Sequence, residues 1–274
     1  MATIAIGQRI GSRGAELGKL IAQRLGARFL GLDDLSLEAA SSYQIDPEQL
    51  RVFDTREPHF WDWLTADTRR LLAYFHAVIL KHLAEDDVVL VSHVMPVWLP
   101  KSVDHVLRVR TVAPAEMRIR RIMDEERLSA RQAKYRVQES DREVQARMKS
   151  LLELDVEDPQ LYNVVLNTAS APLDSLAKIL IDMARAVAES CSANSRILLK
   201  DACIASQVRA ALMAHPKIGH APFEVTSSSG AVTIAGQSLV APWDSMVRDV
   251  ASQIGGVASV RLEVGTLPFV PPPG

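Results

Sequence analysis

A segment near the N-terminus combines spaced glycines with polar residues, and residues 6–16 read IGQRIGSRGAE. It joins an apolar run to a helical pattern, and in such a strand–loop–helix the backbone N–H groups and the helix N-terminus can bind phosphate. The strict pattern G-x-x-x-x-G-K-[ST] is absent, because the loop holds no lysine and Ala15 has no hydroxyl for a magnesium ion. The residues alone leave two interpretations, a phosphate-binding loop or a tight turn without a ligand.

A basic stretch runs from Arg118 to Lys149, where ten Lys and Arg residues stand against six Asp and Glu. This excess of four positive charges lies in a chain whose net charge is −2. Clustered arginines can neutralise phosphoryl oxygens, but charged helices are also commonly solvated faces with i,i+4 pairs. On the residues alone, both interpretations stay open.

The other reactive side chains show no arrangement that predicts chemistry. The seven histidines lack H-x-x-x-H spacing and the two cysteines form no C-x-x-C pair, so no metal site is predicted. Ser92 and His93 are neighbours, but adjacent residues of a strand point to opposite faces and do not form a nucleophile–base pair.

The composition is that of an ordinary water-exposed globular protein, with 48% hydrophobic and 23% charged residues among 274. The net charge of −2 argues against a chain built mainly to bind nucleic acid. No apolar run reaches the roughly 18–20 residues of a membrane span, and no secretory signal is visible. Two cysteines, Cys191 and Cys203, are too few for a disulfide framework, so the expectation is a reduced, cytoplasmic protein.

The elements that position these residues alternate between strands and helices. Apolar runs predict strands at residues 3–6, 88–91, 105–112 and 163–167, the third at or near a sheet edge. Helical spacing predicts helices at residues 17–25, 67–84, 115–126, 129–151 and 174–189. Strands separated by helices predict an α/β fold with a largely parallel sheet.

The pattern changes after residue 189. Residues 190–200 are small and polar, which favours a linker, and residues 201–267 predict a small α+β domain. Its expected elements are a helix at 201–214, two strands meeting near 227–230, a helix at 242–253 and a strand at 258–264. The tail at 268–274 is rich in proline and is expected to be frayed.

Several segments of the first domain, residues 1–189, resemble the cytidylate kinase-like family of P-loop phosphotransferases over about residues 1–186. They are the loop at 6–16, FDTREP at 53–58, RVRTVAP at 108–114, Arg118 to Arg121, SDR at 140–142 and DPQLYNVVLNT at 158–168. The chain departs from the family pattern at Gly7, Gln8, Arg13 and Ala15, and Ser92 to Met95 stand where the family has G-R-G-A.

This resemblance implies a P-loop kinase-like parallel sheet flanked by helices and transfer of a phosphoryl group from ATP, with Mg, to CMP or a related acceptor. It implies that the nucleotide contacts are Gly11, Ser12, Arg13 and Gly14. It implies that lid arginines Arg118, Arg121 and Arg142 close over the transferred phosphate. For the acceptor it suggests Asp33, or its neighbour Asp34, and Arg56.

Residues 201–265 resemble a BON domain, an αββαβ module usually found in periplasmic or membrane-associated bacterial proteins. The resemblance rests on Asp201, on residues 204–212, on GAVTIAG at 230–236 and on IGGVASV at 254–260. It implies a protein or envelope ligand rather than a reaction. With four Lys and Arg against five Asp and Glu, the segment lacks the basic excess expected for anionic membranes.

Two hypotheses of function follow. The first is a nucleoside monophosphate kinase-like enzyme, supported by the order of the matching segments and the lid arginines. The second is a catalytically degenerate nucleotide-sensing or regulatory protein that acts through its C-terminal domain, supported by the departures around the loop. A third interpretation makes the C-terminal domain the functional centre, attached to an envelope component.

Overall fold

The computed structural model describes residues 2–46, 49, 66–93, 98–236 and 243–264 of the chain. These described residues form two compact units, the first lying within residues 1–63 and 85–195 and the second within residues 64–84 and 196–274. Each unit is built around its own sheet.

The first unit is an α/β structure with a parallel five-stranded sheet in the order β2-β3-β1-β4-β5. Its elements are β1 (Thr3–Gln8), α1 (Gly14–Leu25), β2 (Arg28–Leu30), α2 (Leu32–Tyr43), β3 (Val88–Ser92), β4 (Val106–Val112), α5 (Ala115–Glu126), α6 (Ala130–Leu152), the 3-10 turn η4 (Pro159–Leu161), β5 (Val164–Asn167) and α7 (Leu173–Ser190). The strand β1 lies between β3 and β4, so the loop that follows β1 leaves the sheet at the carboxyl ends of the strands, near the middle of the strand order.

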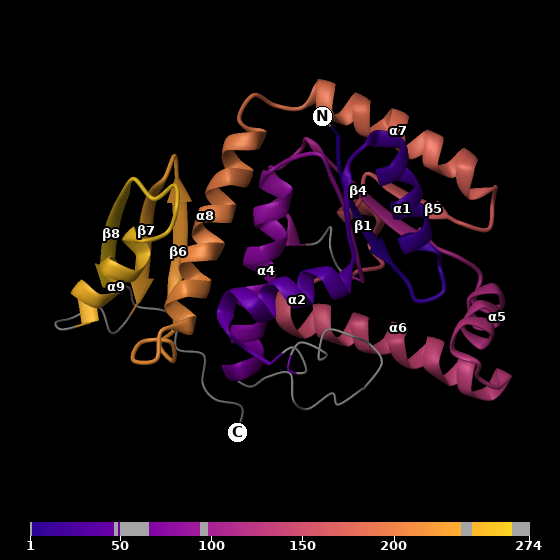
Figure 1. Ribbon diagram of the computed structural model, residues 1–274, viewed down its shortest axis with the longest axis horizontal. Helices are drawn as coiled ribbons and strands as arrows, with labels where there is room; N and C mark the ends of the chain where they lie inside the picture. The colour runs from indigo at the N-terminus through magenta and orange to yellow at the C-terminus, as the bar shows by residue number, and fades with distance from the viewer. Residues whose placement is uncertain (1, 47–48, 50–65, 94–97, 237–242, 265–274) are drawn as a thin grey trace. The chain divides into compact units, whose positions relative to one another are not determined.

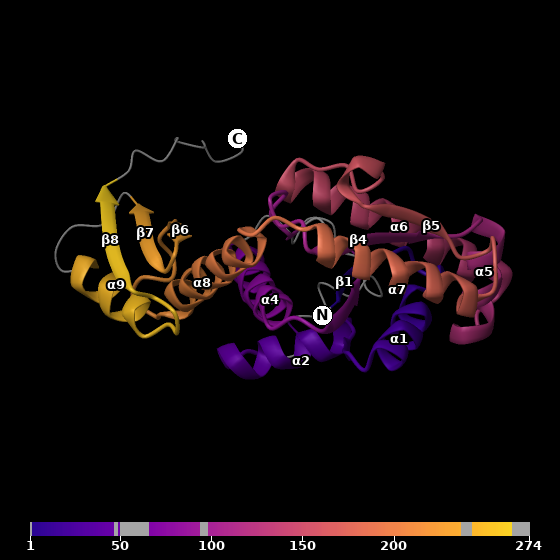
Figure 2. The ribbon, with the colours of Figure 1, turned by 90° about the horizontal axis from the view of Figure 1, so that it is seen from above.

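Helices α1 and α7 lie together over one face of this sheet (Figure 1). Apolar side chains recur along α1 at helical spacing, and Leu17 and Ile21 are fully buried against Ile4 and Ile6 of β1. Burying such side chains contributes about 1.5–3 kcal/mol each, which fixes where α1 begins and therefore where the loop ends. Helices α5 and α6 contact each other, with α5 at one end of the unit and α6 running back from it (Figures 1 and 2).

The long periodic elements of this unit agree with the sequence prediction, including α5, α6, α7 and the four predicted strands. Strand β4 lies one position inside the edge strand β5. The short strand β2 and the helix α2 were not predicted. The three residues of β2 are too few to show a hydrophobic period.

The second unit holds α4 (Ala66–Ala84), most of α8 (Ser195–Ala214), β6 (Glu224–Ser228), β7 (Ala231–Gly236), α9 (Trp243–Ser252) and β8 (Ser259–Val264). Strand β7 is antiparallel to β6 and parallel to β8, and apolar side chains of α8 and α9 pack on the sheet. The order α8-β6-β7-α9-β8 is the predicted αββαβ order. The resemblance to a BON domain stays a prediction.

The junction between the units differs from the expected linker at residues 190–200. Helix α7 runs to Ser190 and α8 already begins at Ser195, because the buried Ser195 hydroxyl accepts hydrogen bonds from the backbone N–H groups of Asp104 and His105. The predicted limits of the two domains stay a prediction. In the described part of the chain, no helix is long and apolar enough to cross a membrane.

The packing of α1 generates a first prediction. We expect Ile21→Ala to lower the free energy of unfolding by about 2–5 kcal/mol, because it removes a fully buried side chain and leaves a cavity. Gln23→Ala, at an exposed position of the same helix, is the control and should change it by less than about 0.5 kcal/mol. Urea unfolding measures both, and a loss below 1 kcal/mol for Ile21→Ala would contradict this packing.

Asp201 generates a second prediction, for the second unit. Burial raises the pKa of this carboxyl, but hydrogen bonds from the N–H groups of Ser229 and Gly230 and from the Ser227 hydroxyl outweigh it and hold the pKa below its ordinary value of 3.8. A depressed folded-state pKa means that the ionised group stabilises the fold above pH 3.8 and ceases to do so as the pH falls through the folded-state value.

We therefore expect Asp201→Asn to cost about 1–3 kcal/mol of unfolding free energy at pH 7, and the difference from the wild type to shrink below pH 3.8. Unfolding curves at both pH values test this. A difference that stays constant with pH would show that the charge of Asp201 does not stabilise the fold.

Candidate functional site

The loop between β1 and α1 is held in one conformation by close backbone contacts. Gly11 has φ +71°, and a Cβ there would lie 2.9 Å from the carbonyl oxygen of Arg118, so only glycine fits. Gly14 begins α1, and a Cβ there would lie 2.7 Å from both Gln8 Oε1 and Thr111 Oγ1. The space in front of the helix is therefore already filled by side chains.

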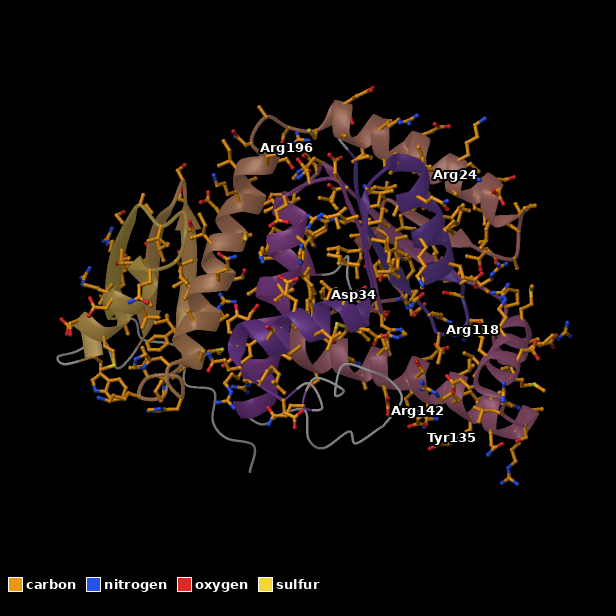
Figure 3. The ribbon with its side chains drawn as sticks, in the orientation of Figure 1. Arg24, Asp34, Arg118, Tyr135, Arg142 and Arg196 are labelled. Atoms are coloured by element: carbon orange, nitrogen blue, oxygen red, sulfur yellow. The ribbon has the colours of Figure 1, made fainter. Side chains whose placement is uncertain are left out.

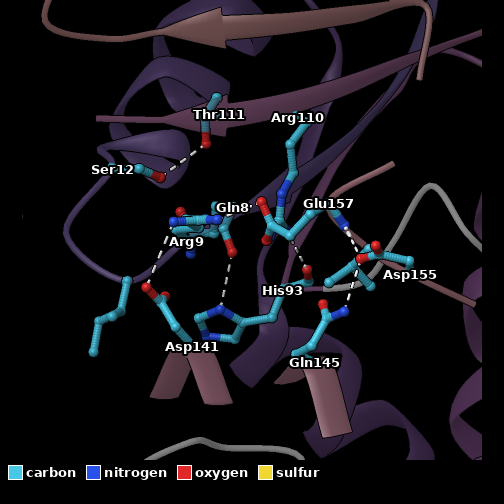
Figure 4. Close-up of polar contacts among 12 residues, drawn as sticks. Gln8, Arg9, Ser12, His93, Arg110, Thr111, Asp141, Gln145, Asp155 and Glu157 are labelled. Atoms are coloured by element: carbon cyan, nitrogen blue, oxygen red, sulfur yellow. Dashed lines mark hydrogen bonds and ion pairs between the residues drawn. The ribbon is translucent and has the colours of Figure 1, made fainter. Parts of the chain in front are cut away.

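Gln8 fills that space. Its side-chain Oε1 accepts a hydrogen bond of 2.9 Å from the backbone N–H of Ala15, in the first turn of α1. Its own carbonyl oxygen lies 3.1 Å from Nδ1 of His93 (Figure 4). First-turn N–H groups are the ones that a phosphate would use, so in this loop a neutral amide bonds to one of them.

Ser12 does not present its hydroxyl to the pocket. The side chain is fully buried, and its Oγ lies 2.9 Å from Oγ1 of the equally buried Thr111 on β4 (Figure 4). This hydrogen bond fastens the loop to the neighbouring strand. Because the Ser12 side chain is fully buried, a ligand or metal ion could reach its Oγ only if the loop rearranged.

Arg13 pairs with Glu16 on the exposed side of α1, with nitrogen–oxygen distances of 2.6 and 3.0 Å. The hydrogen bond from Arg13 holds the pKa of Glu16 below its ordinary value. A pair as exposed as this contributes about 0–1 kcal/mol, so Arg13 is easily released toward a ligand.

Of the three expected lid arginines, two contact the loop. Arg118, which is 2% exposed, donates to the carbonyl oxygen of Ile10 at 3.3 Å and to both carboxylate oxygens of Asp141 at 2.9 and 2.6 Å. Arg121 donates to the carbonyl oxygen of Gly11 at 2.8 Å, and partial burial beside Arg13 lowers the pKa of Arg121. Arg142 extends into solvent from α6 and pairs with Glu139 (Figure 3).

Two further arginines near the loop were missed. Arg9 and Arg110 both bind the carboxylate of Glu157, and Arg110 also donates to the carbonyl oxygen of His93 at 3.0 Å. The signal in the sequence was Arg110 itself, a charged residue inside the apolar run of β4. No local sequence pattern could predict that Glu157, 47 residues further along the chain, is its partner.

A pocket of about 730 Å³ opens beside the loop, between α1, the start of α2 and the α5–α6 pair. Asp33 lines it, and so does Asp34, whose carboxylate accepts a hydrogen bond of 2.8 Å from the N–H of Gly31. Its charged lining residues are Glu16, Asp33, Asp34, Glu125 and Glu126 against Arg13, Lys19 and Arg136. Partial burial near Glu16 and Glu126 raises the pKa of Glu125. The pocket therefore does not concentrate positive charge.

Some expected site residues lie outside the described part of the chain. These are Arg56 with the surrounding segment 53–58, and Val94 and Met95 after His93. Among the residues that are described, no three His, Cys, Asp or Glu side chains gather in a way that could hold a metal ion.

The parallel five-stranded sheet, the helices on its faces and the glycine-containing loop ahead of α1 define an α/β protein of the P-loop kinase-like class. Within that class the relationship is specific. The chain belongs to the cytidylate kinase-like family, whose model matches residues 3–170. No curated protein matches the chain.

Solved structures are similar to this chain at low sequence identity. An uncharacterized protein from Eubacterium ventriosum ATCC 27560 is 14% identical with a TM-score of 0.52, and the match covers 69% of this chain and 99% of that one. Shikimate kinase from Acinetobacter baumannii, in complex with shikimate, is 14% identical with a TM-score of 0.41, over 68% and 94% of the two chains. Shikimate kinase from Bacteroides thetaiotaomicron is 14% identical with a TM-score of 0.40, over 66% and 97%.

The contrast between Arg118 and Arg142 generates a third prediction. We expect Arg118→Ala to lower the free energy of unfolding by about 3–5 kcal/mol, because Asp141 and the Ile10 carbonyl lose a buried partner. Arg142→Ala, which removes an arginine whose side chain is 74% exposed, should cost less than about 0.5 kcal/mol. Thermal and urea unfolding measure both, and equal costs would remove the distinction between the two positions.

Proposed function

We propose that this chain is a nucleotide-binding protein on a kinase-like fold that has lost most of its capacity for phosphoryl transfer and acts as a regulatory protein. One observation carries the proposal. The amide oxygen of Gln8 already accepts the N–H of Ala15, the kind of first-turn group with which such a loop would hold a phosphate.

The energies separate binding from catalysis. Displacing Gln8 costs one neutral hydrogen bond, about 0.5–1.5 kcal/mol net, which weakens nucleotide binding by about tenfold at most. Phosphoryl transfer instead depends on cations placed around the phosphoryl oxygens. Arg118 is committed to Asp141, and separating that buried pair costs about 3–5 kcal/mol.

The residues around the loop also fit a magnesium–ATP complex poorly. The hydroxyl of Ser12 bonds to Thr111, Ala15 offers no oxygen, and the loop contains no lysine. The pocket beside it carries more carboxylates than cations. The loop therefore lacks the side chains that a catalytic step with ATP and magnesium would need.

A second candidate function, a kinase that phosphorylates CMP or a related acceptor, is favoured by Arg121. Its guanidinium contacts the loop at Gly11 yet is only partly buried, so it can reorient toward a phosphate without breaking the ion pair between Arg118 and Asp141. In this alternative, Asp33 in the pocket and Arg56 contact the acceptor.

The regulatory role would be exerted through the second unit. The side chains that alternate with the buried Val225, Val232 and Ile234 are polar or small. Examples are Thr226 and its cross-strand partner Thr233, which in turn pairs with Arg261 of β8. The BON-like resemblance suggests a protein or envelope ligand for this unit. We propose such a ligand as the target that nucleotide binding regulates.

A fourth prediction separates the two candidates. In calorimetric titrations with ATP·Mg²⁺ and with CMP, we expect weak binding to the wild type and up to about tenfold tighter binding to Gln8→Ala, since the variant frees the Ala15 N–H. Gln23→Ala, an exposed glutamine of α1, is the control and should bind as the wild type does. An ADP-release assay with a panel of monophosphates should show no turnover by any of the three proteins.

Turnover by the wild type would favour the kinase instead. In that case Arg121→Ala should lower turnover far more than it lowers stability, and an equal loss of both would make the arginine structural. Absence of nucleotide binding by both the wild type and Gln8→Ala would reject both candidates.

A further inference from the structure

Three arginines and two carboxylates form a cluster beside the loop, which we call the arginine–carboxylate cluster: Arg9, Arg110, Arg118, Asp141 and Glu157. Its members come from the loop, β4, α5, α6 and the segment before η4, and all of them except Arg118 are labelled in Figure 4. Each carboxylate bridges two arginines. Glu157 binds Arg9 through Oε2 and Arg110 through Oε1, and Asp141 binds Arg118 and lies 3.6 Å from Arg9.

The cluster contains one more positive charge than negative. The side chains of Arg110 and Arg118 are both only 3% exposed, and an uncompensated charge is costly at such a depth. The Nε atoms of Arg9, Arg110 and Arg118 are buried and, among the residues that the structure describes, have no hydrogen-bond acceptor. Both the charge and the free donors therefore call for an additional anionic acceptor.

Glu157 is the member that can leave. Its side chain is 41% exposed, against 29% for Asp141, and it lies on the connection between α6 and η4 rather than within a helix. Arg9, its first partner, is 28% exposed, so solvent reaches the side of the cluster where the two meet. An exchange of Glu157 for a dissolved anion needs no opening of the sheet.

We propose that Arg9 and Arg110 form an oxyanion-binding site in which Glu157 is the resident carboxylate, and that a phosphate monoester displaces it. The charges favour this ligand over another carboxylate. A phosphate dianion together with Asp141 neutralises the three arginines, whereas Glu157 leaves one positive charge over. Arginine binds phosphate oxygens in pairs, and a third oxygen can accept from the Nε of Arg9 or of Arg110.

This site is separate from the phosphate-binding role of the loop. It uses the side chains of Arg9 and Arg110, whereas the loop would use backbone N–H groups that Gln8 caps. The inference therefore does not depend on nucleotide binding at the loop. Gln8→Ala changes the backbone N–H site of the loop and leaves the side-chain site at Arg9 and Arg110 in place.

The test compares binding of inorganic phosphate to the full-length wild type, Glu157→Gln and Glu139→Gln. Glu139 is a carboxylate of α6 that pairs with the exposed Arg142, so its variant loses the same charge elsewhere. In calorimetry at pH 7.5 and constant ionic strength, we expect Glu157→Gln to bind phosphate at least tenfold more tightly than the wild type. Glu139→Gln should bind as the wild type does, and adding Arg9→Gln to Glu157→Gln should abolish the gain.

Equal affinities of Glu157→Gln and the wild type would overturn the proposal and leave the cluster as an internal ion-pair network. An equal gain in Glu139→Gln would overturn it as well, since the effect would then be one of net charge. If Glu157→Gln does not fold, the proposal is tested by comparing the melting temperatures of the wild type and Arg9→Gln. Phosphate should raise the melting temperature of the wild type above that in chloride of equal ionic strength, and Arg9→Gln should lose the difference.

The same titration with Glu157→Gln and Gln8→Ala combined separates this inference from the proposed function. The gain in phosphate affinity should persist in the combined variant, because Gln8 is not part of the cluster. A gain that disappears with Gln8→Ala would place the phosphate at the loop and overturn the separate site. Failure of nucleotide binding, by contrast, is read from the ATP and CMP titrations alone.

Discussion

The conformation of the loop depends on one buried ion pair, between Arg118 of α5 and Asp141 of α6. The same guanidinium donates to the carbonyl of Ile10, so a single side chain fastens two helices to the loop. Asp141 in turn lies near Arg9, which brings Glu157 and Arg110 into the same group. Such a pair stabilises little beyond what apolar packing would, but losing one partner is very costly, and that asymmetry keeps the geometry fixed.

Because of this arrangement, the polar groups of the loop find their partners inside the protein. The Gln8 side chain accepts a hydrogen bond from the first turn of α1, and Ser12 is hydrogen-bonded to Thr111. Arg121 donates to the carbonyl oxygen of Gly11. In a phosphate-binding loop, such polar groups are commonly hydrogen-bonded to water or to the ligand. Here a ligand can contact these groups only if their hydrogen bonds within the protein are lost. The net free energy of ligand binding is therefore smaller.

The sequence was informative wherever the physical signal is local. Continuous apolar runs located β1, β3 and β4, and the 3.6-residue period located α5 and α7 almost to the residue. The family membership and the proximity of Arg118 and Arg121 to the loop also followed from segments that could be recognised. Strand β2 was too short to show a period. Nothing local could reveal that Arg9 and Arg110 share Glu157, or that Gln8 turns back to bond to Ala15.

The pairing of Arg9 with Glu157 joins residues 148 positions apart in the chain. During synthesis, the loop leaves the ribosome well before the carboxylates of Asp141 and Glu157, which orient its arginines, have been made. Contacts of such large sequence separation form slowly, since the entropy of closing the intervening chain must be met first. Strands β1 to β4 are therefore complete before Glu157 is made, so the loop acquires its fixed shape only after most of the sheet is present.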